Sequence, residues 1–169
     1  AKQKVIDLGK LISEYTCGLH LTVVKFTHIQ EVIHEKCPED LMITMMRRFM
    51  MRIAERIAIR RKCQAIITGE NLGQVASQTI ESMTSSNSVV KMPVLRPVIA
   101  LDKNDIINIA KNIGTYETSI LPYEDCCTVF LPKYPAIKPR MERILKEEKN
   151  LDVEALIEEA ISSTEEYEL

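Results

Sequence analysis

The feature that most constrains the fold of this 169-residue chain is an alternation of short apolar runs with longer segments of helical periodicity. Three runs rich in β-branched residues predict strands, at residues 19–26, 65–69 and 92–97. Segments with helical spacing lie at residues 4–15, 39–62, 70–83, 102–113, 139–149 and 152–161. Because strands that alternate with helices favour parallel pairing, the pattern predicts an α/β fold with a parallel sheet.

The segment 39–62 has the clearest helical pattern. Its apolar residues form one stripe: Met42, Met46, Phe49, Met50, Ile53 and Ile57. Arginines recur every four residues beside that stripe, at Arg48, Arg52, Arg56 and Arg60. We expect Arg52, Arg56 and Arg60 to form a solvated face, because like charges on one row repel each other. Arg47 lies off that row, near the apolar stripe, where its planar guanidinium can face a phosphate.

Composition excludes several classes of protein. At 46% hydrophobic and 27% charged residues the chain is ordinary for a globular protein, so wholesale disorder is not expected. No run approaches the roughly 18 consecutive apolar residues of a spanning helix. Five cysteines without a CxxC pair argue against a disulfide scaffold. We therefore expect a reduced, cytoplasmic setting and no membrane partner.

The net charge of −2 combines two halves of opposite sign. Residues 1–62 carry 12 basic and 7 acidic side chains, whereas residues 63–169 carry 10 and 17. Residues 151–169 contain seven acidic side chains and no basic one. One interpretation is two solvated faces of opposite charge. The other is a basic half that meets phosphate while the acidic tail packs elsewhere.

The strongest local signal is the junction after the second predicted strand. This strand ends at Gly69 and continues into residues of small side chain, in the run GENLGQVASQT. Such a junction can turn backbone amides and a helix dipole toward an anion. It would lie at the carboxyl end of the strand, where open parallel sheets bind ligands. It is neither a Walker loop nor a GxGxxG motif, so an ordinary tight turn remains the alternative.

Cys126 and Cys127 are the cysteines whose position suggests chemistry. They fall in a loop bounded by prolines, where reactive groups tend to be displayed. A redox-active or sulfur-carrying thiol is the functional interpretation, although Glu124 and Asp125 oppose thiolate formation. Small buried hydrophobic residues are the expectation for the other three cysteines: Cys17, Cys37 and Cys63.

The histidines carry a weaker signal. His28, His34 and Cys37 lie close in sequence, but no second cluster of ligands accompanies them. Structural metal sites combine four such side chains, so we expect no metal ion bound by them. No Ser/His/Asp arrangement and no pair of carboxylates stands out along the chain either. The candidate chemistry is therefore limited to the Gly69 junction, Arg47 and the two adjacent cysteines.

Four motifs carry a specific resemblance. They are MMRRFMMRIAERIA (residues 45–58), GENLGQVASQT (69–79), VLRPVIALDK (94–103) and IGTYETSILPYEDCCTVFLPKYPAIKP (113–139). In this order, from about residue 1 to residue 139, the chain resembles the tRNA 4-thiouridine synthetase (ThiI) family. Several long motifs in register make a chance likeness very unlikely.

The resemblance implies both a fold and a reaction. The family has a doubly wound parallel sheet of the PP-loop, or adenine-nucleotide alpha-hydrolase-like, type. It adenylates a tRNA uridine with ATP and Mg²⁺, and a cysteine persulfide loaded by a cysteine desulfurase supplies sulfur. The same sulfur relay is linked to formation of the thiamine thiazole. On the matching positions, Arg47, Gly69 and Gln78 would line the ATP site. Cys127 would carry the persulfide, with Cys126 as second choice.

The chain also departs from the family pattern. The pyrophosphate loop Ser-Gly-Gly-x-Asp-Ser and the first two strands are expected upstream of residue 1. Residues 1–139 are thus predicted to form a truncated PP-loop domain, partial in its sheet, and residues 140–169 a helical acidic tail. One hypothesis is that the chain is part of a sulfurtransferase and incomplete for catalysis on its own. The alternative is a non-catalytic nucleotide-binding or assembly module, completed by a homodimer or another partner.

Overall fold

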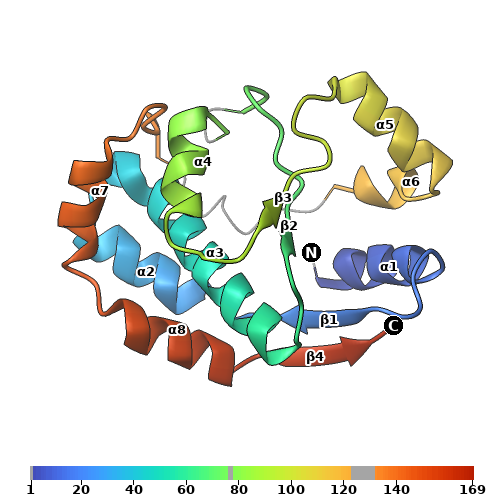
Figure 1. The fold of residues 1–169 in the computed structure, drawn as a ribbon, viewed down its shortest axis with the longest axis horizontal. Coiled ribbons are helices and arrows are strands. Elements are labelled where there is room, and N and C mark those ends of the chain that lie inside the picture. The colour runs from blue at the N-terminus through green and yellow to red at the C-terminus, as the bar shows by residue number, and fades with distance from the viewer. Residues whose placement is uncertain (1, 76–77, 123–131) are drawn as a thin grey trace. The chain divides into compact units, whose positions relative to one another are not determined.

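The computed structural model describes residues 2–75, 78–122 and 132–169. The chain divides into two compact units (Figure 1). Unit 1 consists of Ala1–Val24, Leu101–Val129 and Thr164–Leu169, and unit 2 of Lys25–Ala100 and Phe130–Ser163. Among the residues that the structure describes, no helix is long and apolar enough to cross a membrane.

Unit 1 is built around a two-stranded antiparallel sheet. Its strands are β1 (His20–Val23) and β4 (Glu165–Glu168), which lie side by side in Figure 1. The backbone ladder continues past both strands, since Leu19 and Leu169 exchange N–H···O bonds of 3.0 and 2.9 Å. The helices of this unit are α1 (Lys2–Ser13), α5 (Lys103–Asn112) and α6 (Tyr116–Ser119). The predicted helices at 4–15 and 102–113 are confirmed by α1 and α5.

Gly9 in α1 is buried against two leucine side chains. A Cβ atom there would lie 2.6 Å from Leu169 Cδ1 and 3.1 Å from Leu19 Cδ2. We expect Gly9→Ala to change the free energy of unfolding by less than about 1 kcal/mol, because higher helix propensity offsets displacement of flexible leucine ends. Gly9→Val adds bulk to the same contact and should destabilise by about 1–3 kcal/mol. Urea unfolding of both variants tests this, and equal stabilities would contradict it.

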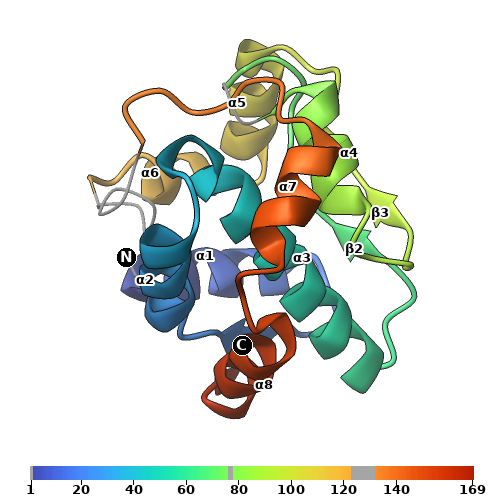
Figure 2. The same ribbon diagram turned by 90° about the vertical axis from the view of Figure 1, so that its left-hand side faces the viewer.

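Unit 2 is organised around α3 (Met42–Arg60), which contacts helices on several sides (Figure 2). These neighbours are α2 (Thr27–Lys36), α4 (Ile80–Asn87) and α8 (Val153–Ser162). The short 3-10 helix η1 (Glu39–Leu41) precedes α3, and α7 (Met141–Glu148) precedes α8. Four members of the predicted apolar stripe are buried: Met42, Met46, Phe49 and Ile53. The stripe therefore forms the core of unit 2, as the sequence predicted.

The two remaining strands of unit 2 pair in parallel. They are β2 (Ile66–Ile67) and β3 (Val94–Leu95), with Ile66 opposite Val94 and Ile67 opposite Leu95. The N–H of Thr68 donates to the carbonyl oxygen of Leu95 at 3.0 Å, so pairing continues beyond β2. Helices α3 and α4 come before and after β2 in the chain. Unit 2 thus contains the parallel strand pair and alternating helices of an α/β fold.

The arginine row of α3 is where the structure departs most from expectation. Arg48 and Arg52 both bind Glu148 of α7, and Arg56 pairs with Glu154 and Glu158 of α8. Arg60 is exposed, as predicted. The prediction of a solvated face is therefore wrong for Arg52, whose side chain is 19% exposed, because Glu148, 96 positions further along the chain, folds onto it. Arg56 lies on the surface, as predicted, and pairs there with exposed carboxylates. The acidic tail packs on the basic helix itself.

Other local features also differ from the predictions. Helices α2 and α6 and strand β4 are not among the predicted elements, and the helix predicted at 70–83 is wrong. Residues 71–75 form turns, in which Gly73 has a φ of +78°. The helix begins at Ile80 instead, because Thr79 adopts an extended backbone and its Oγ1 accepts the N–H of Ser82 at 3.2 Å. Thr79 is therefore the N-cap of α4.

Candidate functional site at the carboxyl end of β2

The candidate site lies in unit 2, where the chain leaves β2. Thr68, Gly69 and Glu70 follow this strand directly. The segment runs beside the residues that follow β3, since the N–H of Leu72 donates to Ile99 O at 3.0 Å and Asn71 Nδ2 donates to Val98 O at 2.6 Å. Two loops are thereby held together at the carboxyl ends of two parallel strands, which is the edge where such sheets bind ligands.

Gly69 is exposed at this edge. A Cβ atom built on Gly69 would have no atom of the described residues within 4 Å. Glycine is therefore not required here for packing within unit 2, and the backbone stays open to a group from outside. The binding role of Gly69 stays a prediction from the resemblance.

Gln78 closes the loop that begins at Asn71. Its side-chain Oε1 accepts the backbone N–H of Asn71 at 2.9 Å, and its carbonyl oxygen accepts the N–H of Gly73 at 2.9 Å. Thr79, the next residue, caps α4 and donates its hydroxyl to Ile137 O at 2.7 Å. Gln78 thus has a structural role in addition to the binding role predicted from the resemblance.

Glu70 is the centre of an ion cluster that the sequence analysis missed. The residue is only 5% exposed, and its carboxylate pairs with guanidinium groups from two other segments. Arg96 Nε donates to Oε2 at 2.6 Å, Thr68 Oγ1 donates to the same oxygen at 2.9 Å, and Arg47 of α3 pairs with Oε1. Arg96 is also held by Asn87 of α4, whose Oδ1 accepts from Nη2 at 2.6 Å.

The cluster has a defined charge balance. Two guanidinium groups face one carboxylate, which leaves one net positive charge. Burial lowers the pKa of Arg96 relative to its usual value. An arginine nevertheless keeps its proton at all ordinary pH values. Two arginine side chains thus meet at the residue that follows Gly69, and the signal for Glu70 in the sequence was its place directly after that glycine.

The structure brings the three predicted ATP-site residues into one connected set. Arg47 contacts Glu70, which follows Gly69, and Gln78 bonds to Asn71 of the same loop. Cys126 and Cys127 lie outside the described residues. The expectation of burial is confirmed for Cys37 and wrong for Cys17 and Cys63, which are exposed.

The surroundings of Cys37 and His28 give weaker evidence of a functional site. Burial, together with the nearby acidic Glu147 and Glu148, raises the pKa of the Cys37 thiol to about 11, so this thiol stays protonated. His28 forms a hydrogen bond of 2.9 Å with Glu159. Within the described part of the chain, no group of three or more His, Cys, Asp or Glu side chains is placed to hold a metal ion.

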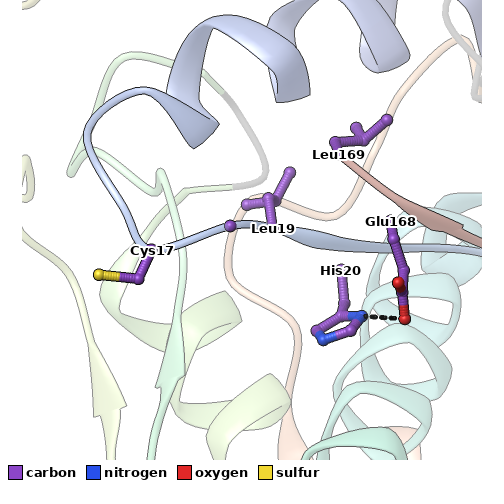
Figure 3. A pocket seen from close by; sticks show the side chains of 6 residues that line it. Cys17, Leu19, His20, Glu168 and Leu169 are labelled. Atoms are coloured by element: carbon purple, nitrogen blue, oxygen red, sulfur yellow. Dashed lines mark ion pairs between the residues drawn. The ribbon is translucent and has the colours of Figure 1, made fainter.

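A pocket of about 380 Å³ lies in unit 1, beside β1 and β4. Its lining includes Cys17, His20 and Glu168 (Figure 3). His20 Nδ1 lies 3.7 Å from Glu168 Oε1, and the thiol of Cys17 points away from both. Because a thiol nucleophile needs a base within hydrogen-bond reach, these three residues do not form a catalytic arrangement.

Comparison with known families gives a decisive result. A family model described as "Thiamine biosynthesis protein (ThiI)" matches residues 1–153. The chain belongs to the ThiI family. The match includes all four motifs on which the resemblance rested, and it includes the site at the carboxyl end of β2. The predicted family membership is therefore confirmed.

Curated relatives of this ThiI chain are named "Probable tRNA sulfurtransferase". The protein of Alkaliphilus oremlandii is 55% identical over 165 residues, covering 98% of this chain and 42% of the relative. The protein of Brevibacillus brevis is 56% identical over 165 residues, covering 98% of this chain and 41% of the relative. The chain thus spans less than half the length of the curated relatives it matches.

A solved structure is also similar to this ThiI chain. It is described as "Crystal structure of a 4-thiouridine synthetase - RNA complex with bound ATP". The TM-score is 0.94 at 40% sequence identity, covering 99% of this chain and 44% of the solved one. The α/β fold of this chain therefore matches that of a 4-thiouridine synthetase.

Proposed function

We propose that this chain forms the nucleotide-binding part of an ATP-dependent tRNA sulfurtransferase that makes 4-thiouridine. The observation that carries the proposal is a connected set at the carboxyl end of the parallel pair β2–β3. Arg47 pairs with Glu70, which follows Gly69, and Gln78 accepts the N–H of Asn71 in the same loop. The solved relative, a 4-thiouridine synthetase bound to ATP and RNA, supports the same assignment. The pair β2–β3 would then be part of a PP-loop sheet, within a domain that spans residues 1–139. The tail at 140–169, predicted as helical, contains α7 and α8 and ends in strand β4.

The residues of the site fit a nucleotide phosphate. Gly69 leaves its peptide open, and the cluster around Glu70 carries one net positive charge. The Oε1 atom of Gln78 is occupied by the loop, so its Nε2 is the group that would donate to the nucleotide. We assign no described residue to Mg²⁺, because the carboxylate of Glu70 is already bound by two arginines.

The proposed reaction has two stages. ATP supplies an adenylyl group to O4 of the uridine with release of pyrophosphate, which turns this oxygen into a good leaving group. The terminal sulfur of a persulfide on Cys127, or on Cys126, then forms a bond to C4, and the C–O bond breaks to release AMP. A second thiol must cleave the remaining S–S bond, and it is oxidised to a disulfide with the cysteine sulfur. A cationic group such as Arg47 would stabilise phosphate charge in the first stage.

The partners follow from that chemistry. The acceptor would be tRNA, and a cysteine desulfurase would load the persulfide. The same persulfide sulfur could be passed to a thiazole precursor, in agreement with the description of the family as a thiamine biosynthesis protein. The alternative, a non-catalytic module completed by a homodimer, stays a prediction, and light scattering of the chain over a range of concentrations tests it.

The proposal predicts a loss of ATP affinity when Arg47 is replaced. The test uses a hybrid enzyme, defined as the Alkaliphilus oremlandii relative with its matching segment replaced by this chain. Arg47→Gln should raise the Kd for ATP about 10- to 100-fold, because charge-assisted hydrogen bonds contribute about 1.5–3 kcal/mol each. Isothermal titration calorimetry measures the Kd, and 4-thiouridine formation is followed on unmodified tRNA.

The matched control is Arg60→Gln, which removes an exposed arginine from the same helix. Its ATP affinity should stay within about twofold of the parent hybrid, since an exposed charge contributes little. Tight ATP binding with no 4-thiouridine would contradict the proposed reaction. A hybrid whose ATP affinity does not respond to Arg47→Gln would remove this residue from the site.

A further inference from the structure

We propose that Glu70 is a positioning residue that holds the guanidinium of Arg47 in place for the phosphate of ATP. This inference rests on the proposed function. Glu70 comes from the loop after β2 and Arg47 from the second turn of α3, so the contact joins two segments of unit 2. The arginine side chain is long and has several rotatable bonds, and fixing it costs conformational entropy that a bound ligand would otherwise have to offset.

The carboxylate of Glu70 is buried, since the residue is only 5% exposed. A buried carboxylate is unfavourable unless charged and hydrogen-bonded partners surround it. Here Arg96 and Thr68 donate hydrogen bonds to Oε2, and Arg47 forms an ion pair with Oε1. Asn87 in turn holds Arg96, so the carboxylate is anchored on the side away from Arg47.

Glu70 does not use up the binding capacity of Arg47. A guanidinium has five N–H donors in a planar fork, and the contact with Glu70 engages Nη2. The side chain of Arg47 also keeps about a fifth of its surface exposed. The exposed part of the Arg47 side chain can therefore face an anion while Nη2 stays on Glu70. The same arrangement occurs when one carboxylate orients a catalytic side chain for another group.

A different role for Glu70 makes the opposite prediction. If this carboxylate only competed with the phosphate for Arg47, its neutralisation would leave a more positive site and tighten ATP binding. If Glu70 positions Arg47, its neutralisation should weaken binding although the site becomes more positive. The sign of the change in affinity therefore separates the two roles.

The test is Glu70→Gln in the hybrid enzyme, with ATP as the titrant. We expect the Kd for ATP to rise about tenfold, in line with the loss of a charge-assisted contact. In an Arg47→Gln background, Glu70→Gln should change the Kd by less than about twofold, because the residue acts through Arg47. If Glu70 had a purely structural role, the losses of ATP affinity caused by Glu70→Gln and Arg47→Gln would instead add in the double variant. The control Glu154→Gln removes a carboxylate that pairs with Arg56 on the surface, and it should leave the Kd unchanged.

Several outcomes would overturn the inference. They are an unchanged or lower Kd for Glu70→Gln, and additivity with Arg47→Gln. If Glu70→Gln does not fold by circular dichroism, Glu70→Asp and Thr68→Val replace it. The first shortens the carboxylate and the second removes its hydroxyl donor, so each should weaken ATP binding by a few-fold, and parent-like affinity for both would refute the role. A parent hybrid that fails to bind ATP contradicts the proposed function instead, which keeps the two failures distinct.

Discussion

Replacing Glu148 with glutamine is expected to lower the free energy of unfolding of the chain at pH 7 by about 3 kcal/mol. Its carboxylate accepts two bonds from Arg48, of 2.9 and 2.8 Å, and two from Arg52, of 2.7 and 3.0 Å. The side chain of Arg48 is 2% exposed, so removal of its partner's charge leaves a buried cation without compensation. Removal of one partner from a buried ion pair typically costs about 3–5 kcal/mol. Urea denaturation measures the difference.

The same residue gives the stability a defined pH dependence. Burial acts to raise the pKa of Glu148, but the hydrogen bonds from Arg48 and Arg52 outweigh it and lower this pKa to about 2. A carboxyl group with a lowered pKa in the folded state stabilises the fold above its unfolded value, near 4.5. This contribution, roughly 3 kcal/mol, should be lost as the pH falls from about 4.5 toward 2. Glu148→Gln should remove that part of the pH dependence.

Glu154→Gln supplies the comparison with an exposed pair. Glu154 and Arg56 are both substantially exposed, so this substitution should cost no more than about 1 kcal/mol. Equal losses for Glu148→Gln and Glu154→Gln would show that burial of the α3–α7 contact is not what stabilises it. A stability profile of Glu148→Gln parallel to that of the parent between pH 4.5 and 2 would contradict the lowered pKa of Glu148.

These pairs also explain what the sequence could and could not predict in unit 2. The apolar stripe of α3 is a local pattern, and its burial followed from helical spacing alone. The same spacing in the arginine row gave no information about partners, because Glu148, Glu154 and Glu158 lie about 100 residues further along the chain. Periodicity shows which residues share a face, but not what covers it.

The site was predicted in outline for a similar reason. The glycine after β2 and the resemblance pointed to residues 69–79 as a binding segment, and the connected set around Glu70 agrees with that location. The error over the helix at 70–83 came from counting Gly73 as helical, although its φ of +78° ends any helix. The true helix start at Thr79 had a local signal, since threonine is a favoured cap. The pairing within the ion cluster had no local signal beyond the place of Glu70 after Gly69, because the cluster joins α3 to residues that follow β2 and β3.

The strand β4 shows most clearly what local sequence patterns fail to predict. Its sequence, EEYE, has three glutamates among four residues and a low preference for strands. It becomes a strand because its backbone pairs with β1, from His20 opposite Glu168 to Val23 opposite Glu165. Such pairing depends on contacts that are distant in sequence. Local patterns therefore predicted the central helix α3 and failed for this edge strand.

The largest effect on activity is expected from Cys127→Ser in the hybrid enzyme. We propose that the Cys127 sulfur carries the persulfide, and a serine hydroxyl cannot hold or deliver a sulfur atom in this way. Loss of a covalent nucleophile lowers rates by at least about 1,000-fold. Formation of 4-thiouridine should fall by at least that factor. It is measured in digested tRNA by the ultraviolet absorbance of the thiolated base. The Kd for ATP should remain within about twofold, because the described nucleotide site uses Arg47, Gly69 and Gln78.

Cys126→Ser is the matched control, since it makes the same chemical change at the neighbouring position. If Cys127 alone carries the sulfur, Cys126→Ser should keep thiolation within a few-fold of the parent. The reverse pattern would assign the persulfide to Cys126. Mass spectrometry of the hybrid after incubation with a cysteine desulfurase and cysteine gives an independent reading, because a persulfide adds one sulfur atom to the peptide that bears it. Full thiolation by both single variants would exclude either cysteine as the obligatory carrier, and the sulfur would then have to reach the activated uridine by another route.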